Sequence, residues 1–139
     1  MKKFPLHIVS QEKELLSVEV ESVSLPTVEG EITVLNKHVP LFSPLKTGEL
    51  VYRIEGQEHI VVVSEGFVNV SPKGEVTVMV DSGILARDIS VSKAEQAVKD
   101  AHETMEKTQD QRELIMAEAS LRQAMMEIKV AQKSKKAKN

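Results

Sequence analysis

Two short alternating runs joined by a turn decide the fold: Gly66-Phe67-Val68-Asn69-Val70, then Ser71-Pro72-Lys73-Gly74-Glu75, then Val76-Thr77-Val78-Met79-Val80. In both runs valine recurs at every second position, which is the period of a β-strand with one buried face. Proline and glycine between the runs are typical of a tight turn. The stretch therefore predicts two antiparallel strands that direct their valines into a common core.

The same pattern extends toward the N-terminus. Apolar residues alternate at 18–20 and again at 50–54, and turn residues separate these runs at short intervals. The apolar parity changes between Val20 and Val23, which predicts a bulge near Glu21 and Ser22, because one extra residue restores the inward face. Many short strands with this spacing predict an antiparallel β-sandwich or flattened barrel.

The composition changes abruptly after Gly83. All six glycines and all five prolines lie at or before that residue, and the following 56 residues contain neither. Long helices exclude both residue types from their interiors. We therefore expect residues 1–86 to form the β-sandwich and residues 87–139 to form an antiparallel α-helical hairpin, with a disordered Lys-rich end from about residue 134.

Helical spacing in the second part predicts how the hairpin packs. Ser92 and Glu95 match a capping box at the start of a first helix. Thr108-Gln109-Asp110-Gln111 supplies a possible cap for a second helix, and Asp110 with Glu113 is an overlapping alternative. Helices joined by so short a break pack side by side in opposite directions. Their predicted seam consists of apolar residues three or four apart on each helix: Ala94, Val98, Ala101 and Met105 on the first, and Leu114, Ala117, Leu121, Ala124, Ile128 and Ala131 on the second.

The second helix is basic. Residues 111–139 carry seven basic and three acidic side chains, and Arg122, Lys129, Lys133 and Lys136 step by seven, four and three, so they share a face away from the seam. This face is either the solvated side of the hairpin or a docking surface for an acidic partner, and the residues alone favour the solvated side. Nucleic-acid binding is not supported, because the helix has no aromatic residue for base stacking.

Composition excludes several kinds of site. The net charge of −3 gives no general attraction to nucleic acid, and the absence of cysteine excludes thiolate metal sites and cysteine nucleophiles. The four histidines lack metal-ligand spacing, and there is no glycine-rich phosphate loop. We therefore expect no catalytic, cofactor or metal site. Direct membrane insertion is not expected either, because no window approaches the roughly 20 apolar residues of a spanning helix.

Specific residues carry the interpretation further. Val28-Glu29-Gly30-Glu31-Ile32-Thr33-Val34-Leu35-Asn36-Lys37-His38-Val39-Pro40-Leu41 resembles the signature Gly-Glu-Leu-Gly-Ile-Leu-Pro-Gly-His-Ala-Pro-Leu of the epsilon subunits of rotary F-type ATP synthases. Residues 63–70 resemble their Val-Ser-Gly-Gly-Phe-x-x-Val, and residues 76–81 resemble their Val-Thr-Val-Leu-Ala-Asp. The order and spacing match over almost the whole chain, although Thr33, Lys37 and Glu65 replace glycines of the family pattern.

The resemblance implies a non-catalytic central-stalk subunit of a proton- or sodium-translocating ATP synthase. Such a subunit would couple rotor rotation to catalysis and inhibit ATP hydrolysis through a mobile C-terminal hairpin. Its implied partners are the gamma subunit, the c-ring and, through the extended hairpin, the catalytic beta and alpha subunits. Its implied location is peripheral, at the cytoplasmic face of the inner membrane.

The resemblance also implies roles for particular residues. Glu29, Gly30, Glu31 and His38 would form the c-ring and gamma contact, and the basic face would meet acidic surface on the catalytic head.

Some bacterial members of the family bind ATP through Ile-Asp-x-x-Arg-Ala in the folded hairpin. Here the corresponding stretch is Ile89-Ser90-Val91-Ser92-Lys93-Ala94, so serine replaces the aspartate and lysine replaces the arginine. An ammonium group does not reproduce the planar fork of a guanidinium, and Ser90 and Lys93 therefore disfavour ATP binding. A stand-alone ATP-sensing module or a helical adaptor module is the alternative function.

Overall fold

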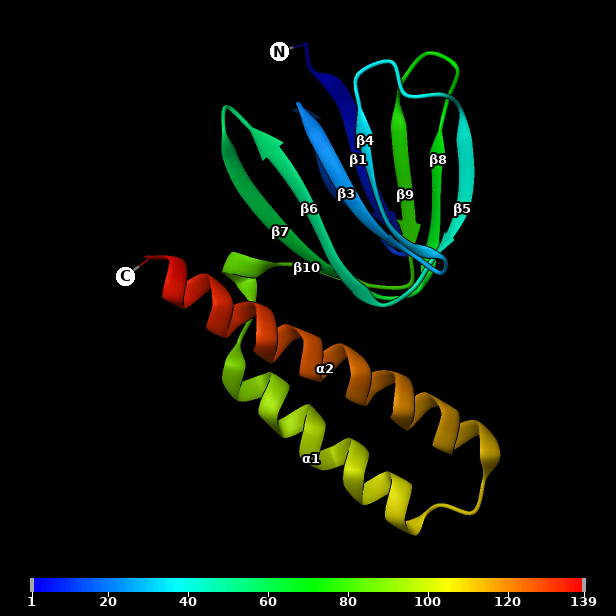
Figure 1. Ribbon diagram of the computed structural model, residues 1–139. Helices are drawn as coiled ribbons and strands as arrows, with labels where there is room; N and C mark the ends of the chain where they lie inside the picture. Colours follow the sequence, from blue (N-terminus) through cyan, green and yellow to red (C-terminus); the bar gives the residue numbers. More distant parts are fainter. Residues whose placement is uncertain (1, 139) are drawn as a thin grey trace. The chain divides into compact units, whose positions relative to one another are not determined.

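The computed structural model describes residues 2–138, with side chains up to residue 134, and comprises two compact units divided between Ile84 and Leu85 (Figure 1). The strands of the first unit are β1 (Phe4–Ser10), β2 (Glu14–Val20), β3 (Ser22–Thr27), β4 (Gly30–Leu35), β5 (Leu41–Leu45), β6 (Gly48–Ile54), β7 (Gln57–Val63), β8 (Gly66–Val70) and β9 (Val76–Val80). A short strand β10 (Gly83–Leu85) leads into the second unit, which contains a 3-10 helix η1 (Ala86–Asp88), α1 (Val91–Lys107) and α2 (Gln111–Lys138).

The strands form one curled sheet. Its order is β10-β7-β6-β3-β5-β8-β9-β1-β2, with β4 attached to β3 outside this path. β1 and β9 run parallel, whereas β1–β2, β3–β4, β3–β5, β3–β6, β5–β8, β6–β7 and β8–β9 are antiparallel pairs. The predicted fold class, an antiparallel β-sandwich or flattened barrel followed by a helical hairpin, is confirmed.

The core follows from the alternation seen in the sequence. Val68 pairs with Val78 and Val70 pairs with Val76, and all four side chains are buried. Successive side chains of a strand point to opposite faces, so these valines share the inner face with residues of the other strands. Burying each valine contributes about 1.5–3 kcal/mol relative to leaving it exposed.

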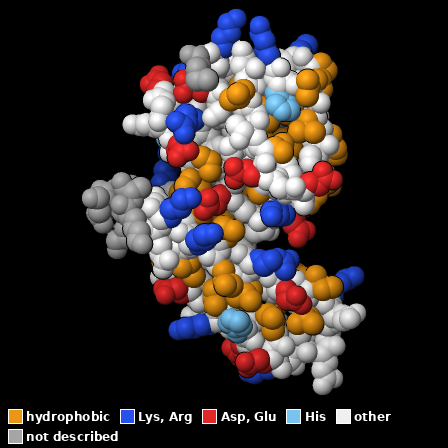
Figure 2. All heavy atoms as spheres, in the orientation of Figure 1, with side chains coloured by type: hydrophobic (Ala, Val, Ile, Leu, Met, Phe, Trp, Pro, Cys, Tyr) orange, Lys and Arg blue, Asp and Glu red, His pale blue; other side chains and the backbone are white. Residues whose placement is uncertain are grey.

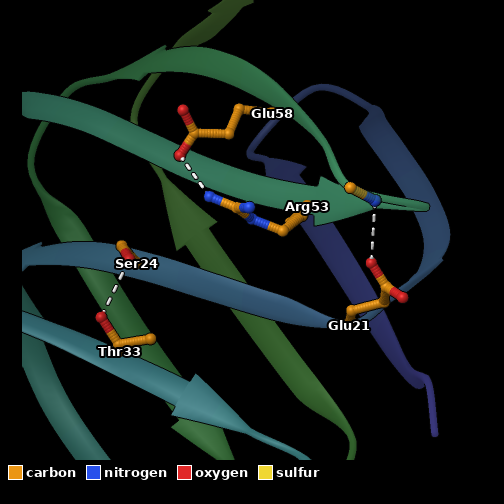
Figure 3. Close-up of polar contacts among 6 residues, drawn as sticks. Glu21, Ser24, Thr33, Arg53 and Glu58 are labelled. Carbon is orange, nitrogen blue, oxygen red and sulfur yellow. Dashed lines mark hydrogen bonds and ion pairs between the residues drawn. The ribbon is translucent and has the colours of Figure 1, made fainter. Parts of the chain in front are cut away.

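The predicted bulge is present between β2 and β3. The Glu21 backbone N–H donates to the Arg53 carbonyl at 2.8 Å, while the next residue, Ser22, is the register partner of Arg53. Two residues therefore oppose one, which restores inward-facing Val23. Polar contacts support this corner: Gly56 donates to the Glu21 carboxylate at 3.2 Å, and Arg53 pairs with Glu58 at 3.0 Å (Figure 3).

A narrow junction joins the two halves of the sheet. Between β3 and β5 the register contains one pair, Thr27 with Leu45. On either side of it, the Lys46 N–H donates to the Pro26 carbonyl at 2.9 Å and the Val28 N–H donates to the Pro44 carbonyl at 3.3 Å. These contacts make β3 the neighbour of β6 at one end and of β5 at the other.

The first helix of the helical unit, α1, begins two residues earlier than the sequence indicated. The N-cap of α1 is Ser90, whose hydroxyl accepts from the Lys93 N–H at 3.3 Å, so the prediction that Ser92 caps the helix was wrong. Ser90 and Ser92 could both serve as the cap. Ser90 has the extended backbone that an N-cap requires, whereas Ser92 already lies within α1. Of the two caps considered for the second helix, the structure uses Asp110, which accepts from the Arg112 N–H at 2.9 Å, whereas Thr108 is the C-cap of α1.

The end of α2 differs from expectation. The helix continues to Lys138, past residue 134, where we expected order to end. Lysine and alanine are good helix formers, and this segment contains neither glycine nor proline to stop the helix. The side chains of residues 135–138 lie outside the described residues.

At Gly66 the backbone of β8 lies close to that of β9. A Cβ atom at this position would stand 2.0 Å from the Met79 carbonyl oxygen and 2.8 Å from the Val80 Cα. Both atoms belong to backbone, so no side chain can rotate away. Only glycine permits this approach.

We therefore expect Gly66→Ala to destabilise the sandwich by roughly 2–4 kcal/mol, because a paired strand must move. The control is Gly74→Ala, where the added Cβ meets no atom within 4 Å and only the positive φ of 89° opposes it. Urea unfolding of the full chain, followed by the fluorescence of the single tyrosine, buried Tyr52, would compare them. Equal loss in both variants would contradict the steric explanation.

Candidate functional site

The acidic turn predicted from the sequence connects β3 to β4. Glu29 and Glu31 are exposed, and Gly30 has a positive φ of 128°, a conformation that other residues rarely adopt. The hydroxyl of buried Thr27 donates to the Gly30 carbonyl, so the turn is held from inside the sandwich. The two carboxylates thus lie on a firmly held, solvent-exposed hairpin end.

His38 lies away from this turn. It follows the opposite end of β4, and its ring Nδ1 lies 2.7 Å from the Val39 carbonyl oxygen. Six residues of strand span about 20 Å at 3.3 Å per residue. The structure therefore brings Glu29, Gly30 and Glu31 together but does not bring His38 to them; a partner touching both would have to extend along β4.

An apolar patch on the outer face of β5, β8 and β9 was not predicted. It comprises Phe42, Pro44, Phe67 and Met79; Phe42, Phe67 and Met79 are 62%, 45% and 40% exposed. The rings of Phe42 and Phe67 stack with centroids 5.4 Å apart, and Phe67 pairs with both Pro44 and Met79. Hydrophobic side chains gather at the surface on the side where Figure 1 places β5 (Figure 2).

One signal in the sequence could have revealed the patch. Phe67 and Met79 fall out of phase with the buried valines of their own strands, so they had to face outward. Two of the three phenylalanines of the chain are in this exposed set. Large apolar side chains that share an exposed face mark an interaction surface.

A pocket of about 450 Å³ adjoins the patch at the β3–β5 junction. Apolar atoms of Val28, Pro44, Leu45 and Phe67 form part of its wall. Lys46, Glu65 and Asp81 are its charged lining residues. The pocket, the patch and the acidic turn thus occupy neighbouring parts of the sandwich.

The helices α1 and α2 pack against one another along small residues. Of the predicted seam, Ala94 and Ala101 are buried, whereas Val98, Met105, Leu114, Leu121 and Ile128 are half-buried. Ala117 and Ala124, also predicted for the seam, are buried, and Ala131 is half-buried. Val130 is buried as well, although it falls outside the predicted seam.

Of the predicted basic face, Arg122, Lys129 and Lys133 are exposed side chains of α2, and the Lys136 side chain lies outside the described residues. Ile115, 65% exposed, precedes Arg122 by seven residues and so begins the same face. Met125, also exposed, lies beside it. The face is therefore mixed, with cations and large apolar side chains together.

Other kinds of site find little support. The Ser90 hydroxyl, at the position of the aspartate in the ATP-binding motif, is engaged in capping α1. Among residues 2–138 no helix is long and apolar enough to cross a membrane. In the same range no three histidine, aspartate or glutamate side chains gather in a way that could hold a metal ion.

Comparison with known proteins gives concordant matches to both units. Residues 3–86 match the family model of the ATP synthase delta/epsilon chain β-sandwich domain, and residues 87–132 match that of its long α-helix domain. An ATP synthase epsilon chain of Dehalococcoides mccartyi is 40% identical over 98% of this chain and 97% of its own length. One from Herpetosiphon aurantiacus is 39% identical over 91% and 92%.

Solved structures share the fold. A chain in the cryo-EM structure of the Euglena gracilis mitochondrial ATP synthase, OSCP/F1/c-ring, has a TM-score of 0.74 at 24% identity, covering 91% of this chain and 79% of that chain. A chain in the central stalk/c-ring structure of the Tetrahymena thermophila mitochondrial ATP synthase has a TM-score of 0.65 at 14% identity, covering 94% and 99%. The two family models, which account for residues 3–132 in order, and the relatives at 39–40% identity show that the chain belongs to the ATP synthase delta/epsilon chain family.

Proposed function

We propose that the chain is a non-catalytic central-stalk subunit of a rotary, proton- or sodium-translocating ATP synthase. It couples rotation of the c-ring to the catalytic head and inhibits ATP hydrolysis through its C-terminal hairpin. The observation that carries this proposal is the match of both units, in order, to the two domains of the family. The alternative, a stand-alone ATP-sensing or adaptor module, is disfavoured because Ser90 caps a helix where the motif needs an aspartate.

The apolar patch is the surface that suits the gamma subunit. Stable protein interfaces place aromatic residues at a dry centre surrounded by a polar rim. The stacked rings of Phe42 and Phe67 provide such a centre, and Lys46, Glu65 and Asp81 around the neighbouring pocket provide polar rim groups. A rigid sandwich attached through this patch would transmit torque without deforming.

The acidic turn suits the polar loops of the c-ring. Exposed carboxylates make hydrogen-bonded contacts that tolerate water, as a polar interface open to solvent requires. The bond from Thr27 to the Gly30 carbonyl restrains the backbone beneath Glu29 and Glu31. A peripheral location at the cytoplasmic face of the inner membrane follows from attachment to the c-ring.

The hairpin suits a two-state inhibitor. Alanines dominate its buried seam, and at about 25 cal/mol per Å² small side chains contribute little free energy per residue. Rearranging the hairpin therefore costs only a few kcal/mol on the same scale. In an extended state, the mixed face of α2 would meet acidic segments of the beta and alpha subunits.

A first experiment targets the patch. Phe42→Gln combined with Phe67→Gln should weaken binding to the gamma subunit at least tenfold, because aromatic residues at an interface centre often contribute more than 1 kcal/mol each. The fold should survive, because both side chains are already exposed. Titration calorimetry with isolated gamma subunit measures the affinity. Val91→Gln, an exposed apolar residue of α1, is the matched control, and equal affinity in all three proteins would remove the patch from the interface.

A second experiment separates the two units. Residues 1–86 should fold alone and bind gamma as the full chain does, because the strands, their turns and the apolar patch lie within this range. Circular dichroism and pull-down with gamma would test both statements. If the fragment is unfolded, the domain boundary is misplaced; if it folds but does not bind, gamma recognition resides in the hairpin.

A third experiment concerns inhibition. Arg122→Gln, Lys129→Gln and Lys133→Gln together should raise ATP hydrolysis by the reassembled enzyme while leaving the seam untouched. The control is the same neutralisation on α1, at Lys93, Lys99 and Lys107, where the pair of Lys107 with Glu103 is exposed and contributes little. Unchanged hydrolysis in the α2 variant would mean that the extended helix blocks the head sterically.

The salt dependence of ATP hydrolysis tests the same contact between α2 and the catalytic head independently. At 1 M salt the screening length falls to about 3 Å, so the charge contribution is removed. Because Ile115 and Met125 accompany the cations, salt should relieve inhibition only in part. Ile115→Gln in the charge-neutralised variant should relieve the remainder, and full relief by salt alone would assign the contact to charge only.

A further inference from the structure

Strand β4 has an open edge. Among the described residues it pairs with β3 alone, over six consecutive residue pairs without a shift in register. At its other edge no strand of residues 2–138 pairs with it. The backbone groups directed toward that edge can be identified from the contacts of Pro26.

Pro26 has no N–H, and its carbonyl accepts from the Lys46 N–H on the β5 side. Both polar groups of a strand residue point to the same side, and the side alternates along the strand. The backbone carbonyl of Pro26 therefore points toward β5, and the backbone N–H and C=O groups of its neighbours Leu25 and Thr27 point toward β4. Their partners, Ile32 and Gly30, bond back to β3.

By the same alternation, Glu31, Thr33 and Leu35 direct their N–H and C=O groups away from β3. The Leu35 carbonyl is used by the His38 N–H at 3.1 Å. The outward donors and acceptors of Glu31 and Thr33 have no partner among the described residues. The Thr33 side chain is held separately, by a 2.9 Å hydrogen bond to the Ser24 hydroxyl (Figure 3).

This edge has little of the protection that natural edge strands usually have. Such strands carry charged side chains, lysine above all, or proline, contain a bulge, or are very short. The sequence of β4, Gly-Glu-Ile-Thr-Val-Leu, has one charged residue, Glu31, but no lysine or proline, and its pairing with β3 contains no bulge. By contrast, β10 has only three residues and the pairing of β2 with β1 contains a register shift.

We propose that the outer edge of β4 binds one extended segment of another protein, which adds a strand to the sheet. Main-chain hydrogen bonds to Glu31 and Thr33 would supply affinity, and side chains would supply selectivity. Next to Glu31, and near Glu29, charge complementarity requires lysine or arginine. Next to Leu35, 49% exposed, an apolar side chain fits, and apolar side chains also fit beside Ile32 and Val34.

The occupant is thus an extended, alternately apolar segment with one cation at the Glu31 end. This mode of binding goes beyond the proposed function, and the test uses the isolated chain with a peptide. Its failure would leave the stalk assignment standing.

The probe is acetyl-Leu-Val-Thr-Val-Lys-amide, written for antiparallel pairing with lysine opposite Glu31. Amide hydrogen exchange of the ¹⁵N-labelled full chain is the measurement. Without peptide, Ile32 and Val34 should exchange slowly and Glu31 and Thr33 rapidly. Millimolar peptide should slow exchange at Glu31 and Thr33 by about tenfold, as expected for amides that gain a ladder bond.

Two variants isolate the edge. Thr33→Pro removes an outward N–H without removing a bond to β3, so the sheet should persist while the peptide effect disappears. Thr33→Val removes the hydroxyl but keeps the N–H, so the effect should remain. A peptide N-methylated at its threonine and lysine, which cannot donate to β4, should be inactive toward the unmodified chain even if Thr33→Pro fails to fold.

Three results would overturn the proposal. One is unchanged exchange at Glu31 and Thr33 in millimolar peptide, and another is equal protection by the N-methylated peptide. The third is a concentration-dependent dimer of the chain alone that Thr33→Pro abolishes, since the occupant would then be a second copy.

Discussion

Every surface of the sandwich considered for binding depends on the short junction between Pro26–Val28 and Pro44–Lys46. Two backbone hydrogen bonds and one register pair continue the sheet from β3 into β5. The acidic turn begins on one side of this junction, the apolar patch begins on the other, and the pocket lies between them. The Pro26 carbonyl accepts from Lys46 on the β5 side. Because the hydrogen-bonding side alternates along a strand, this bond also identifies the residues of β4 whose backbone groups point outward.

Much of the fold could be predicted because it depends on local patterns. Valine at alternate positions, turns at glycine and proline, and the loss of both residue types after Gly83 give the sandwich, the hairpin and the bulge at Glu21. The capping residue of α1 could not be decided in this way, because Ser90 and Ser92 have the same chemistry and differ only in backbone conformation. The separation of His38 from the acidic turn also required the strand between them to be located.

The apolar patch shows a different limit of sequence reasoning. Phe42 and Phe67 are 25 positions apart, and nothing local relates them. They become neighbours only because β5 pairs with β8 in a register that sets Pro44 against Phe67. The basic face could be predicted more easily than the patch, because residues seven positions apart on one helix share a face wherever that helix lies. The contribution of Ile115 to this face was overlooked because only the charged residues were considered.

The parallel pairing of β1 with β9 has a consequence for how the chain reaches its fold. Leu6 pairs with Val76, 70 positions later, whereas β1 and β2 form a local antiparallel pair. Contacts between distant parts of a chain form slowly, because a long loop must close before they contribute. During synthesis the first two strands emerge early but have no inner neighbour until residue 80 has left the ribosome. The sandwich therefore closes late, and its N-terminal hairpin is the part most exposed to wrong pairing before that moment.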